Sequence, residues 1–369
     1  MRAAVVNGIG EGFVIEDVDI AEPIGREVLV HVKAAGLCHT DLTIANHGLG
    51  YQMPSVLGHE VAGVVTAVGP DVTQVRLGDH VIGCLLQSCG MCTKCRMGKP
   101  YQCTDPHSTE RPGGGRLTRA GEPLSQIFGL GGFAEQALIH ENQLVSIPKS
   151  VPFPQAALIG CGVLTGAGAV LNTANVGTGE TVVVIGAGGV GLNAVSGAAI
   201  AAAGKIIVID IDDQKLGKSR RFGATHTVNS RATDPVAAVR GDHRHRRRPR
   251  VRLRRNPQRL RASLGDARSR RGTVPRRNHR PLTTIQVPNV SAVLNQVRVQ
   301  GANFGSANFT RDIPVSLALY GRGRMNLDDL VSREISLDEL PAAYDMLNDP
   351  GSGDHVREVA LPLEPPSPC

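Results

Sequence analysis

The chain has 369 residues, of which 41% are hydrophobic and 44 are glycine, so it is long enough to bury a large core and to form two domains. Its formal charge of +7 would suggest an acidic partner, but residues 241–280 alone contain 16 arginines and only two aspartates. The remainder is mildly acidic, which excludes a basic surface spread over the whole chain. The length and hydrophobic content make a globular enzyme the expected class.

The first residues, MRAAVV, lack the basic and then apolar pattern of a signal peptide, and we expect no apolar stretch to be long enough to cross a membrane. We therefore expect a cytoplasmic protein. In that reducing compartment, eight cysteines at short spacings are expected to be metal ligands or catalytic thiols rather than disulfides.

The first 150 residues alternate short Val-rich runs with Gly and Pro breaks. Examples are EVLVHVKAAG at 27–36, VAGVVTAVG at 61–69 and DHVIGCLL at 79–86. This pattern predicts β-structure with functional loops between the strands.

Four cysteines lie close together in CGMCTKCRMGKPYQC, at Cys89, Cys92, Cys95 and Cys103. Four thiolates on a tight loop can close a tetrahedron around Zn²⁺ and leave no open position, which predicts a structural zinc site. The alternatives are an iron–sulfur cluster, whose usual last spacing differs, and four reduced surface thiols. Cys84 lies outside the set and is expected in the core.

From about residue 176 an apolar run, a Gly turn, a small-residue helix and a second apolar run predict one βαβ unit of a parallel sheet. The sequence GAGGVG stands between the first run and the helix, where a helix N-terminus can receive a pyrophosphate. Asp210 ends the second run, where a carboxylate favours NAD over NADP, and Lys215 is a candidate for the same ribose. The alternative is a Gly-rich turn in an unrelated sheet. The candidate loop residues are Gly186, Gly188, Gly189, Val190 and Gly191.

Three scattered residues suggest a second metal site: Cys38 in GLCHTD, His59 in GHE and Cys161 in IGCGVLTG. Each alone would more often be a core thiol or a satisfied histidine. Together, two thiolates and one imidazole would leave a fourth zinc position open for water or substrate. Towards the end of the chain, residues 326–347 are predicted to be helical.

These motifs occur in the order typical of zinc-dependent medium-chain alcohol dehydrogenases, which the chain resembles over about 1–240 and 283–360. The resemblance implies an α/β fold in which 1–162 and 313–369 form a GroES-like, β-rich catalytic domain. It implies that 163–312 form a Rossmann-type coenzyme domain with a doubly wound parallel sheet.

The implied activity is the reversible oxidation of primary or secondary alcohols to aldehydes or ketones by hydride transfer to NAD, with two zinc ions per subunit. The alternative within the family is a thiol-adduct formaldehyde or aryl-alcohol dehydrogenase. The long loop at 105–130 resembles that of dimeric relatives, so a homodimer is expected.

The resemblance also implies roles for individual residues. Cys38, His59 and Cys161 are similar to the catalytic zinc ligands, and Glu60 to the neighbouring acid that can approach the metal. Many relatives carry a histidine three residues after the hydroxyl that accepts the substrate's proton, but this chain has Thr43 there, with His47 as a possible substitute. The other implied roles are the carboxylate bonded to the histidine ligand (Asp41), that proton-accepting hydroxyl (Thr40) and coenzyme contacts (His39, Thr165 and Arg357).

Residues 241–282 depart from the family, because relatives have two apolar strands, a helix and a Gly-Gly turn there. The length is similar, so we interpret this Arg-rich segment as the product of two compensating reading-frame slips in a GC-rich gene. The alternatives are a solvated basic loop and an arm that binds nucleic acid phosphates, in which case the chain would be a catalytically impaired relative that binds polyanions. Translation of the gene in the other two frames distinguishes them.

Overall fold

The structure is a computed structural model that describes residues 1–241, 253–254, 274–275, 294, 297–348 and 358–361. It divides the chain into two compact units. The first contains Met1–Cys161, Asn308–Leu317 and Leu327–Cys369, and the second contains Gly162–Ala307 and Ala318–Asn326.

A seven-stranded sheet forms the centre of the first unit. Its strands are β4 (Glu27–Gly36), β6 (Val61–Val68), β7 (His80–Gly83), β10 (Gln136–His140), β11 (Leu144–Ile147), β17 (Arg333–Ser336) and β18 (Glu358–Leu361). The order is β11-β7-β6-β4-β18-β17, and β10 also pairs with β4. Along β4, Val28, Val30 and Val32 are fully buried while the intervening side chains are partly exposed. This period of two confirms the predicted strand at 27–36.

A six-stranded sheet lies in the same unit, in the order β2-β1-β5-β9-β8-β3, built from β1 (Arg2–Val6), β2 (Val14–Asp17), β3 (Asp19–Ile20), β5 (Ser55–Val56), β8 (Leu117–Arg119) and β9 (Glu122–Gln126). The helices are α1 (His39–His47), α2 (Thr93–Arg96), α3 (Phe153–Leu158), α11 (Leu340–Asn348) and α10 (Phe309–Gly321), which continues into the second unit. Short 3₁₀ turns occur at η1 (Pro100–Gln102), η2 (Pro106–Thr109), η3 (Ile127–Gly129), η4 (Glu141–Gln143), η9 (Asp328–Leu330) and η10 (Leu337–Glu339).

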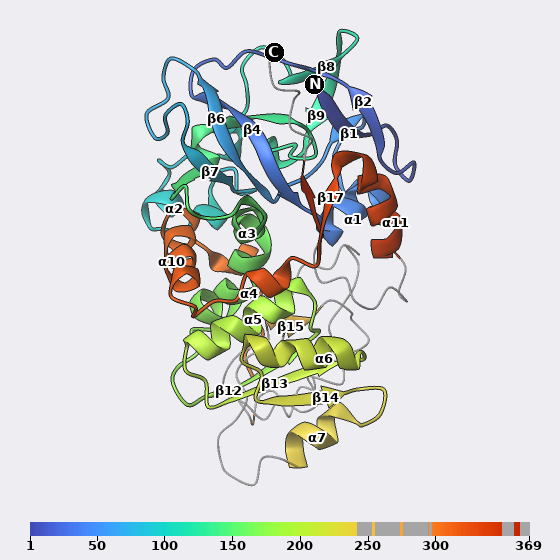
Figure 1. Cartoon of the computed structure of the whole chain (residues 1–369). Helices are drawn as coiled ribbons and strands as arrows, with labels where there is room; N and C mark the ends of the chain where they lie inside the picture. Colours follow the sequence, from blue (N-terminus) through green and yellow to red (C-terminus); the bar gives the residue numbers. More distant parts are fainter. Residues whose placement is uncertain (242–252, 255–273, 276–293, 295–296, 349–357, 362–369) are drawn as a thin grey trace. The chain divides into compact units, whose positions relative to one another are not determined.

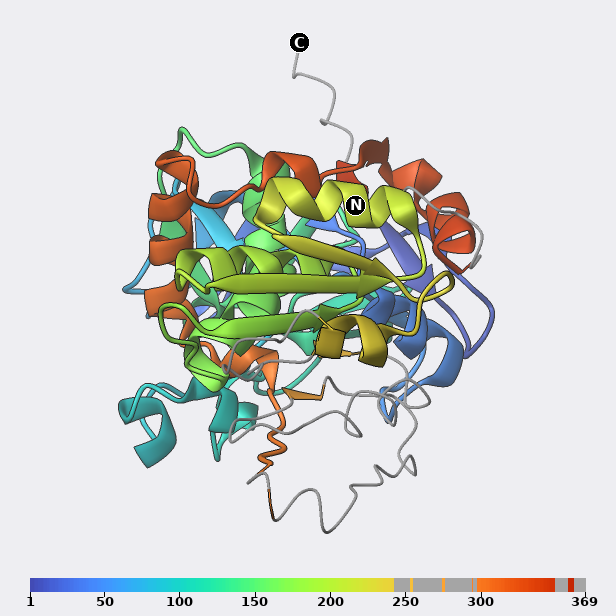
Figure 2. The same cartoon turned by 90° about the horizontal axis from the view of Figure 1, so that it is seen from below.

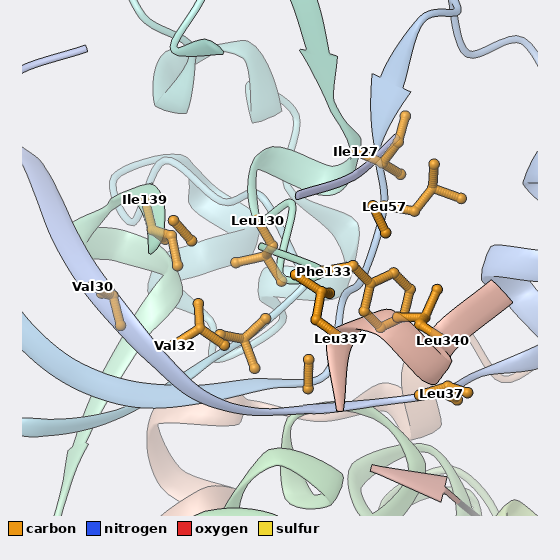
Figure 3. Packing of buried hydrophobic residues seen from close by; sticks show 14 of the residues in the cluster. Val30, Val32, Leu37, Leu57, Ile127, Leu130, Phe133, Ile139, Leu337 and Leu340 are labelled. Carbon is orange, nitrogen blue, oxygen red and sulfur yellow. The ribbon is translucent and has the colours of Figure 1, made fainter. Parts of the chain in front are cut away.

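The main hydrophobic core of this unit joins both ends of the chain. Phe133 and Leu130 pack with valines of β4 and with Leu340 of α11, as Figure 3 shows. All of these side chains are fully buried. Burial of these apolar side chains therefore stabilises the packing of the C-terminal helix α11 against the N-terminal sheet of the same unit.

The C-terminal segment corrects one prediction. Residues 326–347 were expected to be helical throughout, but Arg333–Ser336 form strand β17, which pairs in parallel with β18. Only Ile335 of these four residues is buried. A single buried position shows no periodicity, so the sequence pattern alone cannot distinguish a strand from a helix here. The partner strand at 358–361 fixes the conformation, and local sequence does not reveal that pairing.

The second unit contains a three-stranded parallel sheet of β12 (Thr181–Ile185), β13 (Lys205–Asp210) and β14 (His226–Asn229), in that order. Its strands are apolar runs, as expected for a parallel sheet covered by helices. Figures 1 and 2 show α6 and α7 on opposite sides of these strands. The other elements are α4 (Leu164–Gly168), η6 (Ala169–Thr173), α5 (Gly189–Ile200), α6 (Asp213–Ser219), η7 (Arg220–Phe222), α7 (Pro235–Gly241), β15 (Leu253–Arg254), β16 (Val274–Pro275) and η8 (Phe304–Ser306).

One helical run corrects the expectation that no apolar stretch has the length of a membrane span. Phe153–Thr173 has 21 residues and a mean hydropathy of 1.5, which meets the criteria of length and composition. However, 78% of its 18-residue apolar window is buried inside the protein. That burial is the property of a core helix, so the run is weak evidence for a membrane span.

Two predictions fall outside the described part of the chain. Apart from Gly241 and the short pairs at 253–254 and 274–275, the Arg-rich segment 241–282 is not described, and neither is Arg357. The reading-frame hypothesis and the coenzyme contact of Arg357 therefore stay predictions.

Candidate functional site

Three separate segments of the first unit bring Cys38, His59 and Cys161 together. Cys38 follows the end of β4 and is the N-cap residue of α1, with extended φ and ψ of −122° and 140°. His59 stands just before β6. Gly58 beside it has a φ of +94°, and a Cβ there would lie 2.6 Å from the backbone nitrogen of Phe133. This turn therefore needs glycine. Cys161 lies in a π-helical turn at Ile159–Val163, a local widening that is frequent at functional sites.

The resulting cluster contains four buried residues: Cys38, His59, Glu60 and Cys161. One ligand atom from each lies within 4.8 Å of the ligand atoms of the others. Nε2 of His59 is buried and makes no hydrogen bond, whereas Nδ1 lies 2.9 Å from Asp41 Oδ1. The donor set of two thiols, an imidazole nitrogen and a carboxylate fits zinc, which prefers sulfur and nitrogen ligands.

Asp41 organises the other side of the histidine. Its Oδ1 atom accepts from the backbone N–H of Gly58 at 3.2 Å, and its Oδ2 atom accepts from the hydroxyl of Tyr344 at 3.3 Å. Burial lowers the pKa of His59, but the charges of Asp41 and Cys38 raise it, and the net pKa lies well above its ordinary value.

The four-cysteine loop has a geometry that fits a second zinc ion. The Sγ–Sγ distances are 4.0 Å for Cys89–Cys95, 3.9 Å for Cys92–Cys103 and 3.5 Å for Cys89–Cys103. Two ligands at the usual Zn–S bond length on a tetrahedron are about 3.8 Å apart. The four Sγ atoms all lie within 4.8 Å of one another, so the loop is preformed for a closed tetrahedral site.

Backbone amides stabilise negative sulfur in this loop. The N–H groups of Cys92 and Cys89 point to Cys89 Sγ and Cys103 Sγ at 3.2 Å and 3.3 Å. Backbone hydrogen bonds from Thr104 and Cys95 lower the pKa of Cys92, so that thiolate forms readily. In contrast, Cys84 is fully buried outside the loop, and burial raises its pKa to about 12. The prediction that Cys84 belongs to the core is confirmed.

In the second unit, the Gly-rich loop has the shape that a dinucleotide needs. Gly186 has a φ of +100°, and a Cβ on Gly186 or Gly188 would meet no atom within 4 Å, which leaves open space over the loop. A Cβ on Gly191 would lie 1.8 Å from the carbonyl oxygen of Gly186, so only glycine fits there. Helix α5 begins at Gly189 with Gly188 as its N-cap, and its first N–H groups border that space.

Asp210 ends β13 beside this loop. Its Oδ2 atom accepts from the backbone N–H of Ala187 at 2.6 Å, and its Oδ1 atom accepts from Ile211 and Asp212 at 2.7 Å and 3.2 Å. The carboxylate thus joins the Gly-rich loop to the end of the second strand. Lys215 lies on α6 and is half-buried.

The remaining predicted residues are more dispersed. His39 is exposed and Thr40 half-buried in the first turn of α1. The hydroxyl of Thr43 donates to the carbonyl of His39 at 2.7 Å, so it serves its own helix, and His47 is exposed at the end of that helix. Thr165 belongs to α4 in the second unit.

Two aromatic residues beside the cluster were missed by the sequence reasoning. The ring of Phe128 meets the ring of His59 edge to face, with centroids 5.4 Å apart, and Tyr51 meets Phe128 in the same manner at 5.4 Å. Phe128 has a φ of 55°, which is rare for a residue with a side chain. No sequence motif includes these two residues. The chain contains only seven Phe and four Tyr, so this scarcity was the one sequence feature that could have drawn attention to them.

Comparison with known families matches both parts of the chain. Residues 25–149 match the alcohol dehydrogenase GroES-like domain, and residues 189–247 match the zinc-binding dehydrogenase family. The chain is 36% identical over 371 residues to an NDMA-dependent alcohol dehydrogenase from Amycolatopsis methanolica, covering 98% of each chain. It belongs to the zinc-dependent medium-chain alcohol dehydrogenases.

Other members of the family align equally fully. An S-(hydroxymethyl)glutathione dehydrogenase from Paracoccus denitrificans is 31% identical, with 98% of this chain and 99% of the relative covered. The crystal structure of benzyl alcohol dehydrogenase from Acinetobacter calcoaceticus superimposes with a TM-score of 0.90 at 31% identity, over 98% and 99% of the two chains. The predicted α/β fold, with a GroES-like domain and a Rossmann-type coenzyme domain, is confirmed.

Proposed function

We propose that this protein oxidises small alcohols to aldehydes or ketones with NAD, at a zinc site formed by Cys38, His59 and Cys161. The observation that carries the proposal is the buried cluster of these side chains, with Nε2 of His59 left for a ligand and Nδ1 bonded to Asp41. Zinc in this cluster would supply a Lewis acid that lowers the pKa of an alcohol substrate. A second zinc held by the four-cysteine loop would be structural.

The chain's own residues would then hold and move protons. Asp41 fixes the Nδ1 proton of His59 and thereby the tautomer that directs Nε2 to the cluster. Thr40 would accept the substrate's proton. Thr43 cannot pass it on while its hydroxyl donates to the His39 carbonyl, so the proton would leave by another route. Glu60 adds a carboxylate within reach of the other ligand atoms, so it could approach the metal while the ligand at the open position is exchanged.

We propose NAD rather than NADP, because the Asp210 carboxylate would accept the ribose hydroxyls and repel a 2′-phosphate. NAD would accept the hydride, with its pyrophosphate over the loop Gly186–Gly191 and further contacts from His39, Thr165, Lys215 and Arg357. The open space over Gly186 and Gly188 supports the proposed pyrophosphate position.

Within this function, aromatic alcohols are the favoured substrates. Phe128 and Tyr51 form an edge-to-face pair next to His59, which would offer a ring-shaped substrate an aromatic wall. A relative named benzyl alcohol dehydrogenase adds support. The thiol-adduct alternative rests on relatives named S-(hydroxymethyl)glutathione dehydrogenase.

The domain boundaries 1–162, 163–312 and 313–369, a homodimer and a cytoplasmic location also stay proposals. The homodimer is tested by light scattering during gel filtration.

A substrate screen tests the proposed function. Purified protein with measured zinc is incubated with NAD and ethanol, 2-propanol, benzyl alcohol, or formaldehyde with glutathione, and NADH is followed by absorbance. A parallel series adds NDMA as the acceptor, because a relative carries it in its name. We expect the highest kcat/KM with benzyl alcohol. A zinc-replete protein that turns over none of these substrates in either series would refute the proposal.

A further inference from the structure

A hydroxyl from the far end of the chain reaches the histidine side of the cluster. Tyr344 lies on α11, is 2% exposed, and is separated by 303 residues from Asp41, to which it donates at 3.3 Å. Its ring is stacked on Phe13 with centroids 4.4 Å apart and meets Phe133 edge to face at 5.8 Å. The two rings pack against the aromatic ring of Tyr344, while its hydroxyl lies toward Asp41.

Asp41 needs this donor. The carboxylate is fully buried, so each oxygen requires hydrogen bonds to offset the loss of hydration. Oδ1 is shared between His59 Nδ1 and the N–H of Gly58, while Tyr344 donates to Oδ2. Without the hydroxyl, Oδ2 loses this partner, and the carboxylate can rotate to recover one at the expense of the bond to His59.

We propose that Tyr344 is a positioning residue for the zinc site: its hydroxyl fixes Asp41, which in turn orients His59. The inference rests on the proposed function, since it concerns the same metal site. Partners outside the ligand sphere that orient a ligating histidine typically change metal affinity by 10–100-fold. Tyr344 contacts Asp41 rather than His59 itself, and its hydroxyl also has a hydrogen bond with the backbone of Cys38, so we expect an effect near the lower end of that range.

Zinc release from the holoenzyme tests the proposal without measuring turnover. The protein is mixed with the chelator dipicolinate, and protein-bound zinc is measured over time by elemental analysis. Two zinc sites are expected to release their ions in two kinetic phases. The phase that is absent from the time course of His59→Ala is assigned to the Cys38–His59–Cys161 site. In Tyr344→Phe, which keeps the ring and its stacking, we expect this phase to be about 10-fold faster and the phase of the four-cysteine loop to be unchanged.

Phe13→Leu is the matched control, because it weakens the stack and keeps the hydroxyl. We expect it to lower the thermal midpoint and to leave the assigned release phase at the wild-type rate. A wild-type rate in Tyr344→Phe, or equal acceleration in Phe13→Leu, would overturn the proposal by reducing Tyr344 to a packing role. If His59→Ala removes no phase at all, the proposed zinc site itself fails, and the positioning role with it; that outcome is seen without any Tyr344 variant.

Discussion

Nδ1 of His59 lies 2.9 Å from Oδ1 of Asp41, and both side chains are buried. This pair explains how the chain presents an oriented imidazole to the cluster of thiols. A carboxylate on Nδ1 selects the tautomer whose Nε2 can bind a metal, and it raises the basicity of the ring.

Asp41→Asn tests that pair. The amide keeps one acceptor oxygen but loses the negative charge, and its NH₂ group would face a donor, either Gly58 N–H or the Tyr344 hydroxyl. We expect zinc affinity at this site to fall by about 10–100-fold, measured by titration in zinc buffers. Thr43→Ala on the same helix is the control and should bind zinc like the wild type. An unchanged affinity in Asp41→Asn would contradict the assigned role.

Asp210→Asn tests coenzyme choice. The amide can still accept from Ala187, so the loop should persist, but the charge that disfavours a 2′-phosphate is lost. We expect the ratio of kcat/KM for NAD to that for NADP to fall by about 10-fold or more. This is the fold-change expected for the loss of one hydrogen bond to a charged group. Asp212→Asn, a change in the N-cap of α6, is the control and should retain the wild-type ratio. An unchanged ratio in Asp210→Asn would argue against ribose recognition by this carboxylate.

Cys92→Ser tests the structural site. Loss of one of four thiolates should reduce the zinc content from two ions per subunit towards one and lower the thermal midpoint. Cys84→Ala removes a buried thiol outside the loop, so it should cost packing energy while keeping both zinc ions. Elemental analysis with thermal unfolding separates the two effects, and a full zinc content in Cys92→Ser would exclude the four-thiolate site.

His140 predicts a loss of stability in mild acid. Burial, together with the charges of Arg26 and Arg116, lowers its pKa to about 4. The unfolded chain therefore binds a proton that the folded protein does not, between the ordinary histidine pKa of about 6.5 and that of the folded state. Stability from this group is fully present above about pH 6.5 and falls by up to about 3 kcal/mol as the pH drops to 4.

Urea unfolding of the wild type and His140→Gln at several pH values measures the contribution of His140 to the free energy of unfolding. The difference in unfolding free energy between the two proteins should change with pH between 6.5 and 4 and be constant above this window. A difference that does not vary with pH would show that His140 titrates normally in the folded protein.

The sequence predicted what is local. The four cysteines and the Gly-rich loop each lie within one short segment, so spacing alone indicated their geometry. Cys38, His59 and Cys161 are far apart in the chain, and only the family resemblance joined them. Asp210 was expected at the end of a strand, and its bond to Ala187 follows from the strand order of a βαβ unit.

What the sequence did not reveal depends on long-range packing. The Tyr344–Asp41 bond joins residues 303 positions apart, and nothing near either residue marks it. Phe128 approaches His59 through a turn with positive φ that no propensity predicts. The strand at Arg333–Ser336 was read as helix because its pairing partner lies more than 20 residues later.

Zinc content and NADH formation in Cys38→Ala, compared with the wild type, decide whether Cys38, His59 and Cys161 hold a reactive zinc ion. We expect two zinc ions per subunit and NADH formation from benzyl alcohol in the wild type. In the variant we expect one zinc ion and a loss of kcat/KM of about 10³-fold or more, since the Lewis acid contributes several kcal/mol. A Cys38→Ala protein that retained the wild-type kcat/KM would contradict the proposed zinc site.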